Sequence, residues 1–534
     1  MSQQKSLARE EFATSHHERP QVEEVLSTDV SEEDLAEAYE DEYGVKFSPD
    51  RKRLLWAPID LEHYTVPNSV KVICEAAFSG DSFFQPSLVS ITLPEGITSI
   101  GNEAFSCCYS LTEINLPEGL TSIGDEAFSY CYSLTEINLP EGLTSIGDSA
   151  FSYCTDLTEI NLPEGLTSIT GNPFRGLKLK LQNKSPHFCV EDNVLFSADR
   201  TRLIAYCSDK TEYRVPDTVT SIGNEAFSNC SSLTEIKLPQ GLTSIGNEAF
   251  WGCKSLTEIK LPEGLTSTTD NPFQGLKLKL QNKSPHFCVE DNVLFSADCT
   301  CLIAYCSDKT EYRVPDTVTS IGNWAFSHCY SLTEIKLPEG LTSIEESAFS
   351  DCSSLTEIKL PEGLTSIGES AFSDCSSLTE IKLPESLISI GESAFSGCTS
   401  LTAINLPERI TSMGNSTFSF CSSLTEIKLP EGLTSIGNQA FLDCYSLTEI
   451  KLPEGLTSIG KSVFSGCSSL TAIELPEGLT SIGNSAFLGC SSLTEIKLPE
   501  GLTSMGNWAF SHCESLTSST RDEIKRRFGD RVFY

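Results

Sequence analysis

The sequence has few basic residues for its length. It holds 37 Lys and Arg against 74 Asp and Glu in 534 residues, for a formal net charge of −37. Duplex nucleic acids are bound mainly by Lys and Arg that neutralise phosphates, and anionic membrane surfaces attract basic proteins for the same reason. The composition therefore argues against nucleic acid and against an anionic membrane surface as partners.

Long hydrophobic runs are also missing. Apolar stretches extend over only a few positions, although 39% of the residues are hydrophobic, which is enough for a folded core. A helix that crosses a bilayer needs about 20 consecutive apolar residues, and residues 1–20 contain no apolar segment typical of a secretory signal peptide. The sequence by itself therefore predicts no membrane insertion and favours a cytoplasmic location.

Motifs that carry chemistry are scarce. The chain has seven His without metal-ligand spacing and no C-x-x-C pair, and each Ser of the repeats recurs in a row, so no Ser-His-Asp set stands out. Gly455–Ser462 matches the phosphate-loop pattern G-x-x-x-x-G-K-S, but the same eight positions elsewhere read GLTSIGES, so one substitution in a repeat accounts for the match. We predict no catalytic residues, no cofactor and no metal, hence not an enzyme.

What the sequence does contain is a strict internal repeat. A Leu opens each unit, and the steps within each block are 23 residues. These leucines are at positions 88, 111, 134, 157, 233, 256, 332, 355, 378, 401, 424, 447, 470, 493 and 516. One unit, residues 355–377, reads LTEIKLPEGLTSIGESAFSDCSS. A fixed period of this length is typical of solenoid proteins.

The unit predicts one coil of a solenoid. Leu355, Ile358 and Leu360 have the L-x-x-L-x-L spacing of leucine-rich repeats, and residues alternate between the two faces of a strand. Pro361 cannot donate to a ladder and should end the strand. Stacked coils, about 4.8 Å apart, would bury these apolar side chains in continuous rows. The predicted fold is a leucine-rich repeat solenoid, β-rich, with short strands and turns.

The full pattern, L-x-x-I-x-L-P-x-x-L-x-x-I-G-x-x-A-F-x-x-C, resembles the BspA-like leucine-rich repeats of bacterial surface antigens over roughly residues 47–516. The resemblance implies a curved binding scaffold, often displayed on cell surfaces and used in adhesion. It favours a cell-surface or secreted location, whereas the sequence by itself favours the cytoplasm, so the location stays open.

Interruptions divide the chain into segments. Two nearly identical inserts, 172–223 and 271–322, each contain a predicted hairpin, at 193–206 in the first, and residues 45–55 resemble it. We predict an acidic, mainly disordered N-terminal tail, in which residues 31–43 could form a short helix. The repeat arrays follow, with a hairpin module as the N-terminal cap. A final helix, with Thr520 as its N-cap, closes the last coil. The remaining segments are 1–44 (tail), 45–87 (hairpin cap and first coil), 88–171, 224–270 and 323–517 (arrays), and 518–534 (cap helix).

Fourteen of the 22 cysteines lie three residues before a repeat Leu. Equivalent side chains in successive coils point the same way, which is poor geometry for a disulfide, so we predict a reduced, buried ladder. Cys299 and Cys301 differ, because the first insert has Arg200 and Arg202 at these positions. They are the candidates for an exposed reactive thiol.

The candidate binding surface consists of rows of alternating charge on one strand face. The predicted ligand-binding residues are Glu334, Lys336, Glu357, Lys359, Glu380, Lys382, Glu426, Lys428, Glu449 and Lys451. Ala403 with Asn405, and Ala472 with Glu474, break the rows. The alternative is a solvated face that only keeps the sheet soluble.

These rows lead to a functional hypothesis with open alternatives. We predict a non-catalytic scaffold that binds a protein or glycan ligand along a concave strand face, with adhesion or host interaction as its context. The alternatives are a structural, self-associating repeat protein and a cytosolic interaction scaffold. The chain is expected to be a monomer or to self-associate weakly.

Overall fold

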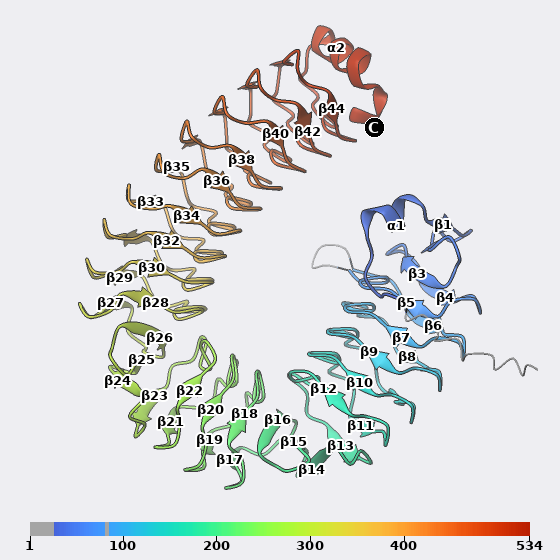
Figure 1. Ribbon diagram of the computed structural model, residues 1–534, viewed down its shortest axis with the longest axis vertical. Helices are drawn as coiled ribbons and strands as arrows, with labels where there is room; N and C mark the ends of the chain where they lie inside the picture. The colour runs from blue at the N-terminus through green and yellow to red at the C-terminus, as the bar shows by residue number, and fades with distance from the viewer. Residues whose placement is uncertain (1–25, 81–84) are drawn as a thin grey trace, which may run out of the picture.

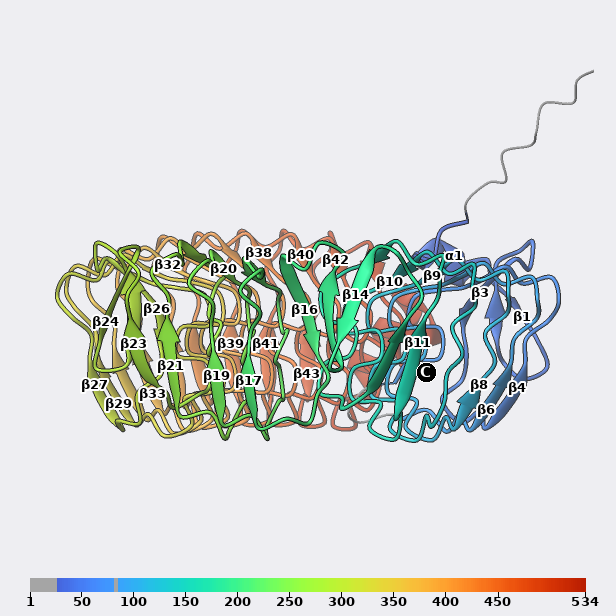
Figure 2. The ribbon, with the colours of Figure 1, turned by 90° about the horizontal axis from the view of Figure 1, so that it is seen from below.

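The computed structural model describes residues 26–80 and 85–534. The coils stack into a curved solenoid that forms most of a ring, with the N-terminal cap and the C-terminal helix on the two sides of its opening (Figure 1). Seen from below, the solenoid is a belt of nearly constant width (Figure 2). The predicted leucine-rich repeat solenoid, with 23-residue coils and little helix, is confirmed.

Each regular coil contributes two short strands that pair in parallel with the next coil. The first, centred on the L-x-x-I-x-L segment, belongs to what we call the strand face. Its members are β4 His63–Thr65, β6 Ser90–Thr92, β8 Glu113–Ile114, β11 Glu159–Leu162, β13 Lys180–Asn183, β17 Glu212–Arg214, β19 Glu235–Lys237, β21 Glu258–Leu261, β23 Lys279–Asn282, β27 Glu311–Arg313, β29 Glu334–Lys336, β31 Glu357–Lys359, β33 Glu380–Lys382, β35 Ala403–Asn405, β37 Glu426–Lys428, β39 Glu449–Lys451, β41 Ala472–Glu474 and β43 Glu495–Lys497.

The second strand of a coil is a two-residue segment, which in most coils is followed directly by a Gly. These strands are β5 Val72–Ile73, β7 Ser99–Ile100, β9 Ser122–Ile123, β10 Ser145–Ile146, β12 Ser168–Ile169, β18 Ser221–Ile222, β20 Ser244–Ile245, β22 Ser267–Thr268, β28 Ser320–Ile321, β30 Ser343–Ile344, β32 Ser366–Ile367, β34 Ser389–Ile390, β36 Ser412–Met413, β38 Ser435–Ile436, β40 Ser458–Ile459, β42 Ser481–Ile482 and β44 Ser504–Met505.

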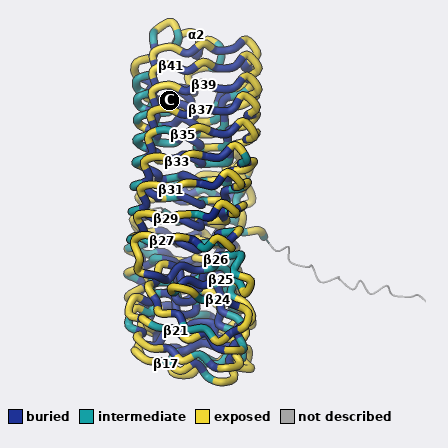
Figure 3. Tube along the Cα trace, turned by 90° about the vertical axis from the view of Figure 1, so that its left-hand side faces the viewer, coloured by how far each residue is buried: buried dark blue, intermediate teal, exposed yellow. Residues whose placement is uncertain are grey.

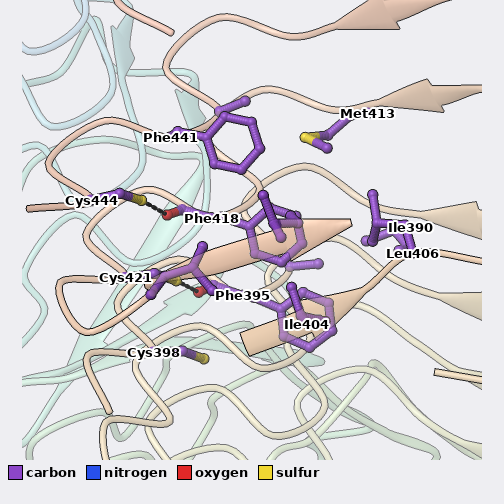
Figure 4. Close-up of a cluster of buried hydrophobic side chains, with 14 of the residues drawn as sticks. Ile390, Phe395, Cys398, Ile404, Leu406, Met413, Phe418, Cys421, Phe441 and Cys444 are labelled. Atoms are coloured by element: carbon purple, nitrogen blue, oxygen red, sulfur yellow. Dashed lines mark hydrogen bonds between the residues drawn. The ribbon is translucent and has the colours of Figure 1, made fainter. Parts of the chain in front are cut away.

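The register of the strand pairs places identical residues of successive coils next to each other. Ile358 of β31 pairs with Ile381 of β33, and Lys359 with Lys382. After the second strand, turns carry the A-F-x-x-C segment back through the core, where Phe349, Phe372 and their equivalents stack, with ring centroids 5.3 Å apart for this pair. Figure 4 shows part of this core, in which the Phe and Cys side chains of consecutive coils are repeated one above another.

The two inserted hairpin modules form layers between three hydrophobic cores, and the first module closes the N-terminal end of the first core. Their strands are β1 Tyr39–Glu40, β2 Lys46–Phe47, β3 Arg53–Trp56, β14 Phe188–Glu191, β15 Val194–Ser197, β16 Arg202–Tyr206, β24 Phe287–Glu290, β25 Val293–Ser296 and β26 Cys301–Tyr305. In the first insert, Leu195 packs into the core of the preceding array, whereas Phe196 packs into that of the next. Because β16 also pairs in parallel with β18, the stack continues through the insert.

The end of the predicted acidic tail is ordered. Helix α1, Glu32–Ala36, begins at Ser31, whose hydroxyl accepts a hydrogen bond from the Asp34 amide. Asp34 pairs with Arg53 at 2.8 Å, and Leu26, Val30 and Ala38 pack in a small cluster with Leu55 of the hairpin module and with Val72 and Cys74 of the first coil. The prediction of disorder was therefore wrong for residues 26–44, because their few apolar side chains pack against the folded chain. Residues 1–25 lie outside the described residues.

The C-terminus covers the last coil. Helix α2, Ser518–Phe528, begins at Thr517 rather than at Thr520, because the chain leaves the core after Leu516. It is followed by a short 3-10 helix, Asp530–Val532, and the Phe510 amide donates to the Val532 carbonyl at 2.9 Å. None of the helices in the described ranges has the length and apolarity that crossing a bilayer requires.

The strand face lies on the outer, convex side of the arc, as Figure 1 and Figure 3 show for β27 to β41. The concave placement expected from the sequence was therefore wrong. The reason is that coils approach closely in every repeat along the A-F segments, where the Phe amides donate to the next coil at 2.7–3.0 Å, whereas the Thr amides beside the strand face donate to the preceding coil at 2.7–3.5 Å. The stack bends toward the shorter bonds, so the A-F segments face inward.

Candidate binding surface on the outer strand face

The strand face exposes two side chains from each regular coil. In β31 the central Ile358 is 3% exposed, while Glu357 and Lys359 on either side are exposed to solvent. This follows from the alternation of side chains along a strand whose inner face is buried. All ten predicted site residues are exposed in this way, and parallel register brings them together in two adjacent rows.

Three shallow hollows follow one another along these rows. Their volumes are about 530, 730 and 470 Å³, in chain order. Each of the ten predicted residues lines at least one hollow. The structure thus brings the predicted residues together in one elongated surface, on the convex side instead of the concave side.

The middle hollow is the largest, and it lies at the first break in the rows. Ala403 and Asn405 of β35 stand where most neighbouring coils carry Glu and Lys, so shorter side chains leave space above the strand. The hollow is lined by Ile381, Ile404 and Leu406 as well as by charged residues. An apolar floor with a charged rim suits a ligand that combines apolar and polar groups.

Several lysines of the rows are already paired. Lys336 lies 2.8 Å from Glu334 in its own strand, whereas Lys451 lies 2.9 Å from Glu431, which follows the Pro of the preceding coil. The Lys451 ammonium lowers the pKa of the Glu431 carboxyl. Such exposed pairs contribute little to the stability of a fold, because solvent screens them, so a ligand can replace them at little cost.

Lys359 and Lys382 differ from these lysines. Within the described part of the chain, neither has an acidic partner within 4.0 Å, and both line the middle hollow. Glu408, from the turn after β35, also lines it and lies 3.5 Å from Lys428. Glu408 was not among the predicted residues, although the Glu of L-P-E-G recurs with the same period and would have placed a third row beside the other two.

The residues that match a phosphate loop serve the stacking of the coils instead. In the segment that matches a phosphate loop, the Lys461 amide donates to Asn438 Oδ1 of the preceding coil at 2.8 Å, and turns follow in place of a helix. The amide needed for a phosphate is thus used in stacking. Among the described residues, no group of three or more His, Cys, Asp or Glu is arranged to hold a metal ion.

A charged cluster at the first insert was not predicted. Arg175 lies 2.9 Å from Glu225 and 3.1 Å from Glu248, and its guanidinium lies 4.7 Å from the Trp251 ring centroid. Burial raises the pKa of Glu225 to about 7, although Arg175 opposes this shift. In the second insert, Gln274 replaces Arg175; this difference between two nearly identical segments was the available signal.

Comparison with known proteins assigns this repeat architecture to a family. The family model described as the BspA type leucine-rich repeat region matches residues 56–180, 202–286, 302–425 and 411–534. No curated protein matches the chain.

Solved structures of similar chains include three bacterial repeat proteins. A leucine-rich repeat protein from Bacteroides ovatus is 24% identical over 93% of this chain and 97% of its own, with a TM-score of 0.30. A leucine rich cell surface protein from Faecalibacterium prausnitzii is 25% identical over 82% and 94%, with a TM-score of 0.32. The Treponema pallidum leucine-rich repeat protein is 26% identical over 44% and 88%, with a TM-score of 0.31. With its 23-residue coils and its family match over most of its length, the chain belongs to the BspA-type leucine-rich repeat family.

Proposed function

We propose that the protein is a non-catalytic scaffold that binds an extended protein segment or glycan along the outer strand face between β29 and β41. The observation that carries the proposal is the series of three hollows lined by the charged rows. With strands about 4.8 Å apart, six steps span roughly 29 Å, or roughly nine residues of extended peptide. The preformed surface lowers the ordering cost of binding.

The middle hollow is the proposed centre of this surface. It combines the space at Ala403 with the two lysines, Lys359 and Lys382, that lack an acidic partner among the described residues. A ligand there gains ion pairs or hydrogen bonds without first breaking a pair within the protein. The rows of like residues on either side favour repeated, individually weak contacts, which sum when a ligand spans several coils.

Adhesion at a cell surface is the context that we propose for this binding. The family match and the similarity to a leucine rich cell surface protein support it. A cytosolic interaction scaffold uses the same surface with an internal partner. Fractionation of the native cells, with protease treatment of intact cells, distinguishes the two: digestion on intact cells supports surface display, and protection supports the cytosolic alternative.

The binding test uses two variants with the same change of charge. K359E/K382E reverses the two lysines of the middle hollow, and K254E/K461E reverses two exposed lysines that lie outside the strand face. Arrays of glycans and of immobilised matrix proteins are probed with wild type and both variants. We expect K359E/K382E to lose at least tenfold of the signal for one ligand class, and K254E/K461E to keep it. Equal binding of both variants would contradict the proposal.

Self-association is the second candidate, because the near-identical rows offer repeated surfaces. The stack is closed at its N-terminal end by the antiparallel strands β1, β2 and β3 and at its C-terminal end by α2, which argues against end-to-end stacking. Light scattering during size-exclusion chromatography across a hundredfold range of concentration tests it. A constant mass of one chain supports the ligand-binding scaffold, and a mass that rises with concentration supports assembly.

A further inference from the structure

The two hairpin modules differ at one contact between a cysteine and the following turn. In the first module, Arg200 Nε donates to Cys189 Sγ at 3.2 Å. In the second, the equivalent residues are Cys299 and Cys288, so a second thiol stands where the guanidinium was. The duplication therefore supplies an internal comparison for this pair.

The backbone of the turn is the same in both modules. Arg200 and Cys299 both have positive φ, 58° and 57°. The carboxylate of Asp298 accepts hydrogen bonds from Ser296 Oγ at 2.6 Å and from Thr300 Oγ1 at 2.9 Å, and Asp199 does the same in the first module. Since the turn is held alike, the side chain of Cys299 leaves the backbone in the direction that Arg200 takes toward Cys189.

The side chain of Cys299 is accordingly directed toward Cys288, as Arg200 is toward Cys189. The neighbouring Cys299 thiol, together with burial, raises the pKa of the Cys288 thiol to about 11. Cys288 therefore keeps its proton in the reduced protein near neutral pH. Both residues are partly exposed, so a small reagent in solution reaches them.

We propose that Cys288 and Cys299 are a redox-active dithiol that forms a reversible disulfide by exchange with a small-molecule disulfide such as oxidised glutathione. The Cys299 thiolate attacks one sulfur of the reagent, which breaks its S–S bond and releases one glutathione thiol. Cys288 then loses its proton and attacks the Cys299 sulfur, which releases the second glutathione. Two protein thiols are oxidised and one small disulfide is reduced.

The other cysteines are placed differently. In the repeats, thiols such as Cys352 and Cys375 are buried and donate to a backbone carbonyl of the preceding coil. Cys301, the second candidate from the sequence, lies on β26 opposite Ser320, and burial raises its pKa. The disulfide would tie β24 to the turn after β25, at the boundary between the second and third arrays. At the first boundary, Arg200 makes the equivalent contact and cannot be oxidised.

Peptide mapping of the full chain tests the proposal. Reduced, desalted protein is incubated with oxidised glutathione, remaining thiols are blocked with N-ethylmaleimide, and the chain is digested with trypsin. Residues 284–309 form one tryptic peptide that contains both cysteines, and a second cut after Glu290 separates them unless a disulfide joins them. We expect the two halves to stay linked in wild type and in Cys301→Ser until a reductant is added.

The informative variants are Cys299→Arg, which restores the residue of the first module, and Cys299→Ser. In both, we expect the linked product to fall at least tenfold and Cys288 to carry glutathione instead, as Cys189 would in the same digest. The proposal is overturned if the linked product survives in Cys299→Arg, if it is lost in Cys301→Ser, or if Cys288 and Cys299 of wild type both react only with N-ethylmaleimide. Because Cys299→Arg copies a natural module, a folding failure is not expected, and Cys299→Ser decides the matter if one occurs.

Discussion

The thiol of Cys421 donates a hydrogen bond to the backbone carbonyl of Phe395, in the preceding coil, with sulfur and oxygen 3.2 Å apart (Figure 4). Burial raises the pKa of this thiol well above its ordinary value, so the sulfur keeps the proton that it donates. The same bond, at 3.0–3.3 Å, is made by Cys108, Cys131, Cys154, Cys253, Cys352, Cys375, Cys398, Cys444, Cys467, Cys490 and Cys513. A Cys recurs because it is small, apolar and a donor at once.

Two substitutions of Cys421 separate packing from hydrogen bonding. Cys421→Ala leaves the Phe395 carbonyl without its donor and opens a small cavity, so we expect a loss of about 1–2 kcal/mol. Cys421→Ser keeps a donor and should cost less. Urea denaturation under reducing conditions measures both; a Ser variant less stable than the Ala variant would show that the thiol acts only by packing.

The close approach of coils at the conserved glycines gives a second prediction. A Cβ on Gly391 would clash with the Glu369 amide nitrogen, a backbone atom of the preceding coil, whereas a Cβ on Gly340 meets nothing within 4 Å. We expect Gly391→Ala to destabilise the third array by about 1–3 kcal/mol and Gly340→Ala to change stability by less than about 0.5 kcal/mol. Equal denaturation midpoints for the two variants would contradict this stacking.

The repeat made most of the fold predictable. Leu355, Ile358 and Phe372 recur at fixed intervals, and burial of such rows admits only a stack of coils. The direction in which the solenoid bends was not predictable in this way. Both sides of a coil are extended, and the distance between successive coils differs between the two sides only through hydrogen-bond lengths that differ by a few tenths of an ångström. The thiol–carbonyl bond was also hidden, since a buried Cys is equally compatible with packing alone.

The pH dependence of the boundary between the first insert and the second array follows from Glu225. Its pKa in the folded chain is about 7, raised first by burial, against an ordinary value of 4.5. A carboxyl whose folded pKa is raised binds protons more tightly in the folded state, so stability falls as pH rises from about 4.5 to 7, by at most about 1.4 kcal/mol per pH unit. Burial also raises the pKa of the neighbouring Glu248 and Asp148, which adds to the same trend.

Glu225→Gln removes one of these groups and leaves the Arg175–Glu248 pair. We expect its denaturation midpoint to vary less than that of wild type between pH 5.5 and 7.5. Glu495→Gln, on the exposed strand face, controls for the change of net charge and should keep the wild-type slope. A slope that is unchanged in Glu225→Gln would contradict the assignment.

Filling the middle hollow tests its importance for binding without adding net charge. A403E/N405K restores the Glu and Lys of the neighbouring coils, so the solenoid should keep its stability within about 0.5 kcal/mol, while longer side chains occupy the space above β35. We expect ligand affinity to fall at least fivefold in a titration by surface plasmon resonance. The corresponding change at the second break, A472E/E474K, also produces the Glu and Lys of the other coils but raises the net charge by one; it lies at the end of the surface and should have a smaller effect.

The candidate surface could be predicted only in part. Alternation identified Glu357, Lys359 and their equivalents as exposed residues, and the structure brings them together. The hollows between these residues depend on the short side chain of Ala403 and on turn residues such as Glu408. The positions of the turn residues relative to the rows are set by the backbone of the turns, which the repeat pattern does not give. That Cys299 is directed toward Cys288 required the turn geometry, because eleven positions separate the two residues in the sequence.

Covalent labelling of lysines tests the central claim most directly, with and without the ligand that is identified on the glycan and matrix-protein arrays. If the outer strand face binds the ligand, Lys336, Lys359, Lys382, Lys428 and Lys451 should lose most of their reactivity toward an acetylating reagent when the ligand is present, while Lys254 and Lys461 keep theirs. Protection of Lys254 and Lys461, with the five strand-face lysines still fully reactive, would contradict the proposed binding surface.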